Sequence, residues 1–155
     1  MNARIANPAA AAPAAWQAMI ALETALVKSG LEQSLYHLVK TRASQINGCA
    51  YCVHMHTSDA RKHGESEMRL YLLSAWRESS LYSPRERAAL AWTEALTLLA
   101  QTNAPDEVYA ALTPHFTEAE IANLTVLIGC INAWNRIAVG LRSQHPLRAA
   151  DQRAA

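Results

Sequence analysis

Two cysteines and a histidine lie close together in the stretch 46–64, which reads INGCAYCVHMHTSDARKHG. Cys49 and Cys52 are separated by two residues, and His56 follows the second cysteine by four positions. On a helix these positions are i, i+3 and i+7, so the three side chains share one face. We expect Cys49 in the first turn, where free N–H groups and the helix dipole stabilise a thiolate. The cluster is therefore suited to thiol redox chemistry, with His56 holding or delivering a proton near neutral pH.

Two other interpretations of this cluster stay open, a metal site and a pair of buried structural cysteines. A zinc site needs four ligands, and no second CxxC or HxxxH follows at the spacing of a zinc finger. His54 points away from the face of the other three residues and is not automatically a ligand. We therefore expect neither a metal nor a bound cofactor, and we favour the redox interpretation.

The composition limits the classes of partner. The chain has 155 residues, with 14 Lys and Arg against 13 Asp and Glu, so it lacks the charge excess suited to nucleic acid or anionic membranes. No run of twenty apolar residues appears, which argues against a membrane span. The first sixteen residues form an Ala/Pro tract without the leucine-rich core of a secretion signal. We expect a cytoplasmic protein, and in a reducing compartment a CxxC pair is more often catalytic or metal-binding than a structural disulfide.

The elements that must position these residues are predicted to be helical throughout. Two capping boxes start helices, one at Ser83 with Glu86 and one at Thr117 with Glu120. We expect a disordered Ala/Pro-rich tail over 1–13, one all-α domain over 14–145 and a polar tail over 146–155. The expected helices, about seven in number, cover 13–29, 31–45, 49–64, 67–74, 84–100, 106–112 and 117–141.

Three polar or nucleophilic side chains interrupt the apolar stretch TVLIGCINAWNR of the last expected helix. Cys130 is most simply a thiol of the hydrophobic core. Asn132 and Asn135 are expected to satisfy buried polar groups or to line a contact between subunits.

Three segments carry a resemblance to a known family: RASQINGCAYCVHMHTSDARKHGE, SPRERAALAWTEALT and FTEAEIANLTVLIGCINAWNRIAVG. They resemble the alkylhydroperoxidase AhpD-like branch of the carboxymuconolactone decarboxylase superfamily. The similarity extends over about 14–141, and the CxxCxxxH motif after QING is its most specific part. The resemblance implies an all-helical fold that assembles as a homo-trimer or homo-hexamer, and it implies thiol-dependent reduction of organic hydroperoxides.

The resemblance also implies a role for each residue of the motif. Cys52 attacks the hydroperoxide and becomes a sulfenic acid, and Cys49 resolves this acid as a disulfide. An external dithiol, such as a lipoylated protein, then reduces the disulfide, and His56 belongs to the proton relay. Helix electrostatics by themselves favour Cys49 as the thiol of lower pKa, so the choice of Cys52 depends on a neighbouring base.

The sequence departs from the family pattern at that base. Members of this branch carry a glutamate twelve residues before the first cysteine, and here the position is His37. An imidazole can act as a base near pH 7, although it supplies no negative charge; the alternative is a solvated histidine on the polar face of its helix. Glu94 lies on an apolar helix, where it is either exposed on a polar strip with Thr97 and Gln101 or buried beside a partner. If it is buried facing the cysteines, it could replace the missing glutamate as the base. His63 is expected to cap the end of its helix.

These observations predict a thiol-dependent alkylhydroperoxide reductase with an antioxidant role and with Cys52, Cys49, His56 and His37 as its catalytic residues. The alternative is a non-catalytic or redox-sensing helical oligomer that keeps the cysteines and has lost efficient turnover. Lactone decarboxylation is the least expected activity, because nothing in the sequence resembles a ring-binding acid–base set.

Overall fold

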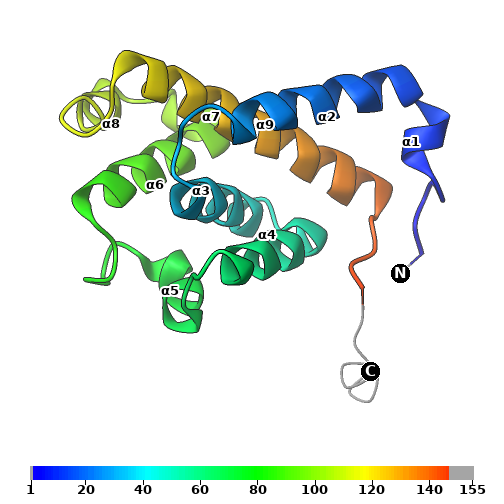
Figure 1. Cartoon of the computed structure of the whole chain (residues 1–155), viewed down its shortest axis with the longest axis horizontal. Helices are drawn as coiled ribbons and strands as arrows, with labels where there is room; N and C mark the ends of the chain where they lie inside the picture. Colours follow the sequence, from blue (N-terminus) through cyan, green and yellow to red (C-terminus); the bar gives the residue numbers. More distant parts are fainter. Residues whose placement is uncertain (1, 147–155) are drawn as a thin grey trace.

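The structure is a computed structural model of the chain, and it describes residues 2–146. Within these residues the fold is all-α, as predicted, and contains no β-strand. Its α-helices are α1 (Pro8–Ala11), α2 (Pro13–Val27), α3 (Gln33–Ile46), α4 (Ala50–Lys62), α5 (Glu67–Leu72), α6 (Pro84–Thr97), α7 (Leu99–Thr102), α8 (Asp106–Ala110) and α9 (Glu118–Leu141). A short 3₁₀ helix, η1 (Leu73–Ala75), continues α5. In Figure 1, α2 and α9 run side by side along one edge and α3 lies at the centre, in contact with α4, α6 and α9.

Helix α3 is buried almost all round. Nine of its 14 residues are buried, and these include polar side chains such as His37, Thr41 and Ser44. The sequence left open that His37 lies on a solvated polar face of this helix, but His63 at the end of α4 lies beside His37, and Asn135 of α9 bonds to Ser44. A helix that is enclosed in this way is a core helix and can carry functional groups into the interior.

Helix α9 is the longest helix among the described residues, and its length and apolar composition would allow it to cross a membrane. In the structure, its inward side chains Leu124, Leu127 and Ile128 are fully buried in the main hydrophobic core. The same core contains residues of α2, α3 and α6. Packing within the chain therefore accounts for the apolar side chains on one side of α9, while Val126 and Val139 are exposed.

Both predicted capping boxes are present. Ser83 accepts a hydrogen bond from the Glu86 amide and Thr117 accepts one from the Glu120 amide, and each glutamate side chain bonds back to its cap. The helix predicted over 84–100 is divided, however, since α6 ends at Thr97 and α7 follows as a separate turn.

The described part of the segment 1–13 is folded onto the domain, where the sequence suggests a disordered tail. Asn7 caps α1 by accepting a hydrogen bond from the Ala10 amide. The Arg4 amide donates to the Leu141 carbonyl at 2.9 Å, and the Arg4 guanidinium donates to the Gly140 carbonyl at 2.8 Å. Of the predicted polar tail over 146–155, all but Pro146 lies outside the described residues.

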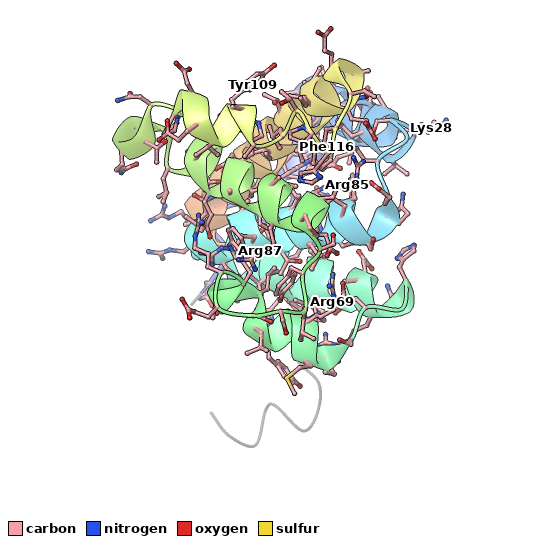
Figure 2. All side chains as sticks on the ribbon, turned by 90° about the vertical axis from the view of Figure 1, so that its left-hand side faces the viewer. Lys28, Arg69, Arg85, Arg87, Tyr109 and Phe116 are labelled. Carbon is pink, nitrogen blue, oxygen red and sulfur yellow. A yellow bond between two sulfur atoms is a disulfide. The ribbon has the colours of Figure 1, made fainter. Side chains whose placement is uncertain are left out.

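Arginine side chains hold the helices together on the face shown in Figure 2. Arg85 of α6 pairs with Glu32 at 2.8 Å and with Glu120 at 2.7 Å, and its guanidinium lies 3.8 Å from the centre of the Phe116 ring. These contacts fasten α6 to the start of α3 and to α9. They stabilise the packing of α6 against these two helices.

Candidate functional site

A tight turn connects α3 to α4 and carries the first cysteine. Asn47 is the C-cap of α3, and Gly48 has a φ of 64°, a left-handed conformation that favours glycine. Cys49 is the N-cap of α4, one position before the predicted first turn, and its Sγ accepts a hydrogen bond from the Cys52 amide at 3.3 Å. The sulfur of Cys49 therefore lies at the positive end of the helix dipole.

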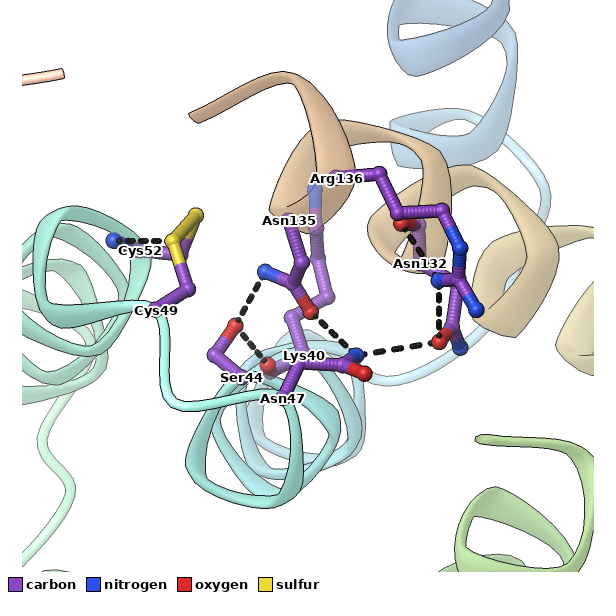
Figure 3. Close-up of a disulfide and its surroundings, with 8 residues drawn as sticks. All are labelled: Lys40, Ser44, Asn47, Cys49, Cys52, Asn132, Asn135 and Arg136. Carbon is purple, nitrogen blue, oxygen red and sulfur yellow. Dashed lines mark hydrogen bonds between the residues drawn. A yellow bond between two sulfur atoms is a disulfide. The ribbon is translucent and has the colours of Figure 1, made fainter. Parts of the chain in front are cut away.

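Cys49 and Cys52 form a disulfide, which Figure 3 shows together with its surroundings. Their Cα atoms are 5.4 Å apart, within the range that a disulfide spans without rearrangement of the backbone. Both side chains are buried, and Ala138 of α9 packs against them. The two sulfur atoms thus lie close enough to bond within this fold.

A cavity of about 880 Å³ opens beside this pair. Cys52, His56 and His37 line it, so the structure brings three of the four predicted catalytic residues to one space. Cys49 is not among the described residues that line the cavity. Much of the wall is apolar or aromatic and includes Trp16, Ile20, Tyr51, Met55, Trp134 and Ile137. A ligand in the cavity therefore meets Cys52 rather than Cys49.

His37 and His56 are buried, with 6% and 4% of their surfaces exposed, so the alternative of a solvated His37 is wrong. None of their four ring nitrogens has a hydrogen-bond partner, whereas almost all other buried side-chain polar atoms of the described residues have one. Burial lowers the pKa of His56 to about 3, and the charge of Lys40 acts in the same direction. Burial and then the charge of His63 lower the pKa of His37. Both rings are neutral at pH 7, and each has one N–H donor and one acceptor for a ligand.

His63 ends α4 as predicted. It is the C-cap residue, and its Nδ1 bonds to the Asp59 carbonyl at 2.9 Å. Helix periodicity places His63 on the same face as Cys52 and His56, and its ring lines the same cavity. Its contact with the ring of His37, on another helix, is not contained in that periodicity.

A charged network that the sequence analysis did not identify lines the cavity as well. The Lys40 ammonium donates to both oxygens of the Glu23 carboxylate, at 2.7 and 2.8 Å, and the Tyr36 hydroxyl donates to the same carboxylate at 2.6 Å. Burial raises the pKa of Glu23, but Lys40 and Tyr36 outweigh burial and hold it below its ordinary value. The spacing of Tyr36 and Lys40, four residues apart on one helix face, is the one signal in the sequence that points to this network.

Glu94, the suggested substitute for the missing glutamate, does not line the cavity. Its carboxylate pairs with Arg42 at 2.8 Å and Arg77 at 2.7 Å, and it accepts a hydrogen bond from the Trp76 indole at 2.8 Å. Burial raises the pKa of Glu94, but the three donors outweigh burial and hold the pKa below its ordinary value. The carboxylate is therefore ionised and is bound by three side chains. The structure therefore does not bring Glu94 to the cysteines.

Cys130 lies in the hydrophobic core, as predicted. Its thiol donates to Glu23 at 3.4 Å, and burial together with the charge of Glu23 raises its pKa to about 12. This thiol stays protonated and is a poor nucleophile. No group of three His, Cys, Asp or Glu side chains suited to a metal ion occurs within residues 2–146.

The chain is similar in sequence to a known protein family and to a bacterial relative. The model of the carboxymuconolactone decarboxylase family matches residues 10–95. The uncharacterised protein YdfG of Bacillus subtilis (strain 168) is 43% identical over 130 residues, which are 84% of this chain and 88% of YdfG.

Solved structures with the same fold include a close relative and a distant one. ATU0492 from Agrobacterium tumefaciens is 52% identical, with a TM-score of 0.92, over 95% of this chain and 100% of that one. ATU0492 is described as a protein of unknown function and as a candidate antioxidant defence protein, AhpD. The debrominase Bmp8 is 20% identical with a TM-score of 0.76, over 88% of this chain and 72% of its own. The likeness to Bmp8 shows the fold alone.

Proposed function

The chain belongs to the carboxymuconolactone decarboxylase family, in its AhpD-like branch, and from this premise we propose that it is a thiol-dependent reductase of organic hydroperoxides. One observation carries the proposal. Cys52 lines a largely apolar cavity that also holds two buried imidazoles without hydrogen-bond partners, and Cys49 lies behind it at bonding distance. The fold by itself does not select this reaction, since a debrominase has it too.

In the first step, the Cys52 thiolate attacks the terminal oxygen of the hydroperoxide. An S–O bond forms while the O–O bond breaks, so that sulfur is oxidised to a sulfenic acid and the peroxide is reduced to an alkoxide, which takes up a proton and leaves as an alcohol. His37 accepts the proton of the Cys52 thiol, and the N–H group of His56 donates to the leaving oxygen. Two neutral rings with free nitrogens are suited to both tasks.

In the second step, the Cys49 thiolate attacks Sγ of Cys52. The S–S bond forms while the S–O bond breaks, and the departing hydroxide takes up a proton to become water. An external dithiol, such as a lipoylated protein, then reduces the disulfide by thiol–disulfide exchange and is itself oxidised to a disulfide. Such dithiols are kept reduced in the cytoplasm, so we propose that the protein acts there. We also propose that it assembles as a homo-trimer or homo-hexamer.

The size and chemistry of the cavity support an organic substrate. A volume of about 880 Å³ lies in the range of pockets that bind drug-sized ligands, and hydrogen peroxide would fill a small part of it. The aromatic side chains of Trp16 and Trp134, whose ring centres lie 5.2 Å apart, offer an apolar surface to the body of the substrate.

A stopped-flow assay of the fully reduced protein with cumene hydroperoxide tests the proposal. We expect the rapid loss of two thiols per chain and of one peroxide, and recovery of both thiols with dihydrolipoamide. The variant Cys130→Ser is the matched control, because it lacks a thiol that the mechanism does not use. Thiols that stay reduced for minutes would overturn the proposal, and one round of oxidation without turnover would favour a redox-sensing protein.

A further inference from the structure

We propose that three hydrogen-bonded side chains, Ser44, Asn47 and Asn135, position Cys49 for the disulfide-forming step; this inference rests on the function proposed above. None of the three belongs to the catalytic residues named so far. Together they connect α9 to the turn between α3 and α4 that carries Cys49, as Figure 3 shows.

Asn135 uses both ends of its amide in this connection. Its Oδ1 accepts a hydrogen bond from Nδ2 of Asn47 at 2.8 Å, and its own Nδ2 donates to Oγ of Ser44 at 3.0 Å. Nδ2 of Asn47 also donates to Oδ1 of Asn132 at 3.0 Å. Because Asn47 is the last residue before Gly48, these bonds fix the point at which the chain leaves α3.

Ser44 carries the connection from Asn135 to the cysteine. Its carbonyl accepts a hydrogen bond from the Cys49 amide at 3.0 Å, and its hydroxyl donates to the Lys40 carbonyl at 2.7 Å. Ser44 and Asn135 are 0% and 1% exposed, so any bond lost here leaves a buried polar atom without a partner. The network therefore has one low-energy arrangement, and that arrangement holds the Cys49 backbone.

The turn itself contributes little side-chain packing that could hold it in place. Gly48 is exposed and nothing lies within 4 Å of the place where a Cβ would be, so no side-chain packing restrains it. Ala138, one turn after Asn135 on α9, packs against both cysteines. One face of α9 thus fixes the turn and also covers the sulfur atoms.

The two cysteines depend on the turn to different degrees. Cys52 lies inside α4 and is held by the helix, whereas Cys49 precedes it as the N-cap and is held by the turn. Displacement of the turn therefore affects the attack of Cys49 on the sulfenic acid, which needs both sulfur atoms aligned. It has little effect on the attack of Cys52 on the peroxide.

The experiment measures the two steps separately in Asn135→Ala and Asn47→Ala. We expect peroxide consumption in the first turnover to stay within about twofold of the wild-type rate, while closure of the disulfide slows by about tenfold or more. The sulfenic acid at Cys52 then persists and is trapped by dimedone. The disulfide also becomes easier to reduce in dithiothreitol buffers, and a tenfold change in its equilibrium constant corresponds to about 30 mV.

The variant Asn123→Ala is the matched control, since Asn123 lies on the same helix but bonds to the Ser29 carbonyl at 3.4 Å, far along the chain from the turn. We expect it to change neither step. In folded Asn47→Ala, equal slowing of both steps, or no slowing of disulfide closure, would overturn the inference. Because Asn47 is only half-buried, this variant tests the inference even if Asn135→Ala does not fold. Because the reduction potential is measured without peroxide, it tests the inference even if the wild-type protein fails to reduce peroxides.

Discussion

The ring of His37 lies 4.8 Å from the ring of His63, measured between their centres, and both side chains line the cavity beside Cys52. The pair joins α3 to the end of α4. It places an exposed histidine against a buried one, so the charge of His63 acts directly on the base that we propose for the reaction. This relationship makes the pH dependence of the protein testable.

Replacement of His63 with glutamine is expected to move the acid limb of the kcat/KM profile to higher pH. Burial lowers the pKa of His37 first, and the charge of His63 lowers it further, so removal of that side chain lets the pKa of His37 rise towards its ordinary value. A base with a higher pKa becomes protonated, and inactive, at a higher pH. An unchanged limb would show that His37 is not the base, and NMR titration of its ring would measure the shift directly.

The two cysteines are expected to respond differently to substitution with serine. Cys52→Ser removes the sulfur atom that lines the cavity and should abolish peroxide consumption. Cys49→Ser should retain one round of peroxide consumption and leave a sulfenic acid at Cys52, detected by mass spectrometry after dimedone treatment. The reverse pattern would identify Cys49 as the attacking thiol.

His37→Glu restores the carboxylate of the family pattern and is expected to raise turnover by about tenfold, since a carboxylate adds a negative charge that the neutral imidazole lacks. Steady-state kinetics with cumene hydroperoxide and a dithiol would measure the change. His115→Glu introduces the same residue outside the cavity and is the control. If turnover does not change, the proton acceptor lies elsewhere among the groups of the cavity.

Lys40→Met is expected to lower the free energy of unfolding by about 3 kcal/mol, because it leaves the Glu23 carboxylate partly buried without its cation. The double variant Lys40→Met with Glu23→Gln removes both charges and should recover part of this loss. Urea unfolding at pH 7 measures both values. Equal stability of the two variants would mean that the unpaired Glu23 carboxylate is not the cause of the loss.

Several features of the site follow from short stretches of sequence. The local sequence specifies the spacing of Cys49, Cys52 and His56 on one helix, the break at Gly48 and both capping boxes. These features depend on contacts between residues that are close in the chain. The all-α class follows for the same reason, since helical periodicity is a local property.

Other features depend on which helices pack together, and no local pattern contains that information. The burial of His37 results from the packing of α4 and α9 over α3. The partners of Glu94 come from α3 and from the segment after η1, and they hold it away from the cysteines. Glu23 reaches Lys40 across 17 residues of chain, and Asn135 reaches Ser44 across 91. The sequence by itself determined the CxxCxxxH motif and the helix that presents it. Tertiary packing decided which charges and imidazoles surround the motif, because those neighbours come from distant parts of the chain.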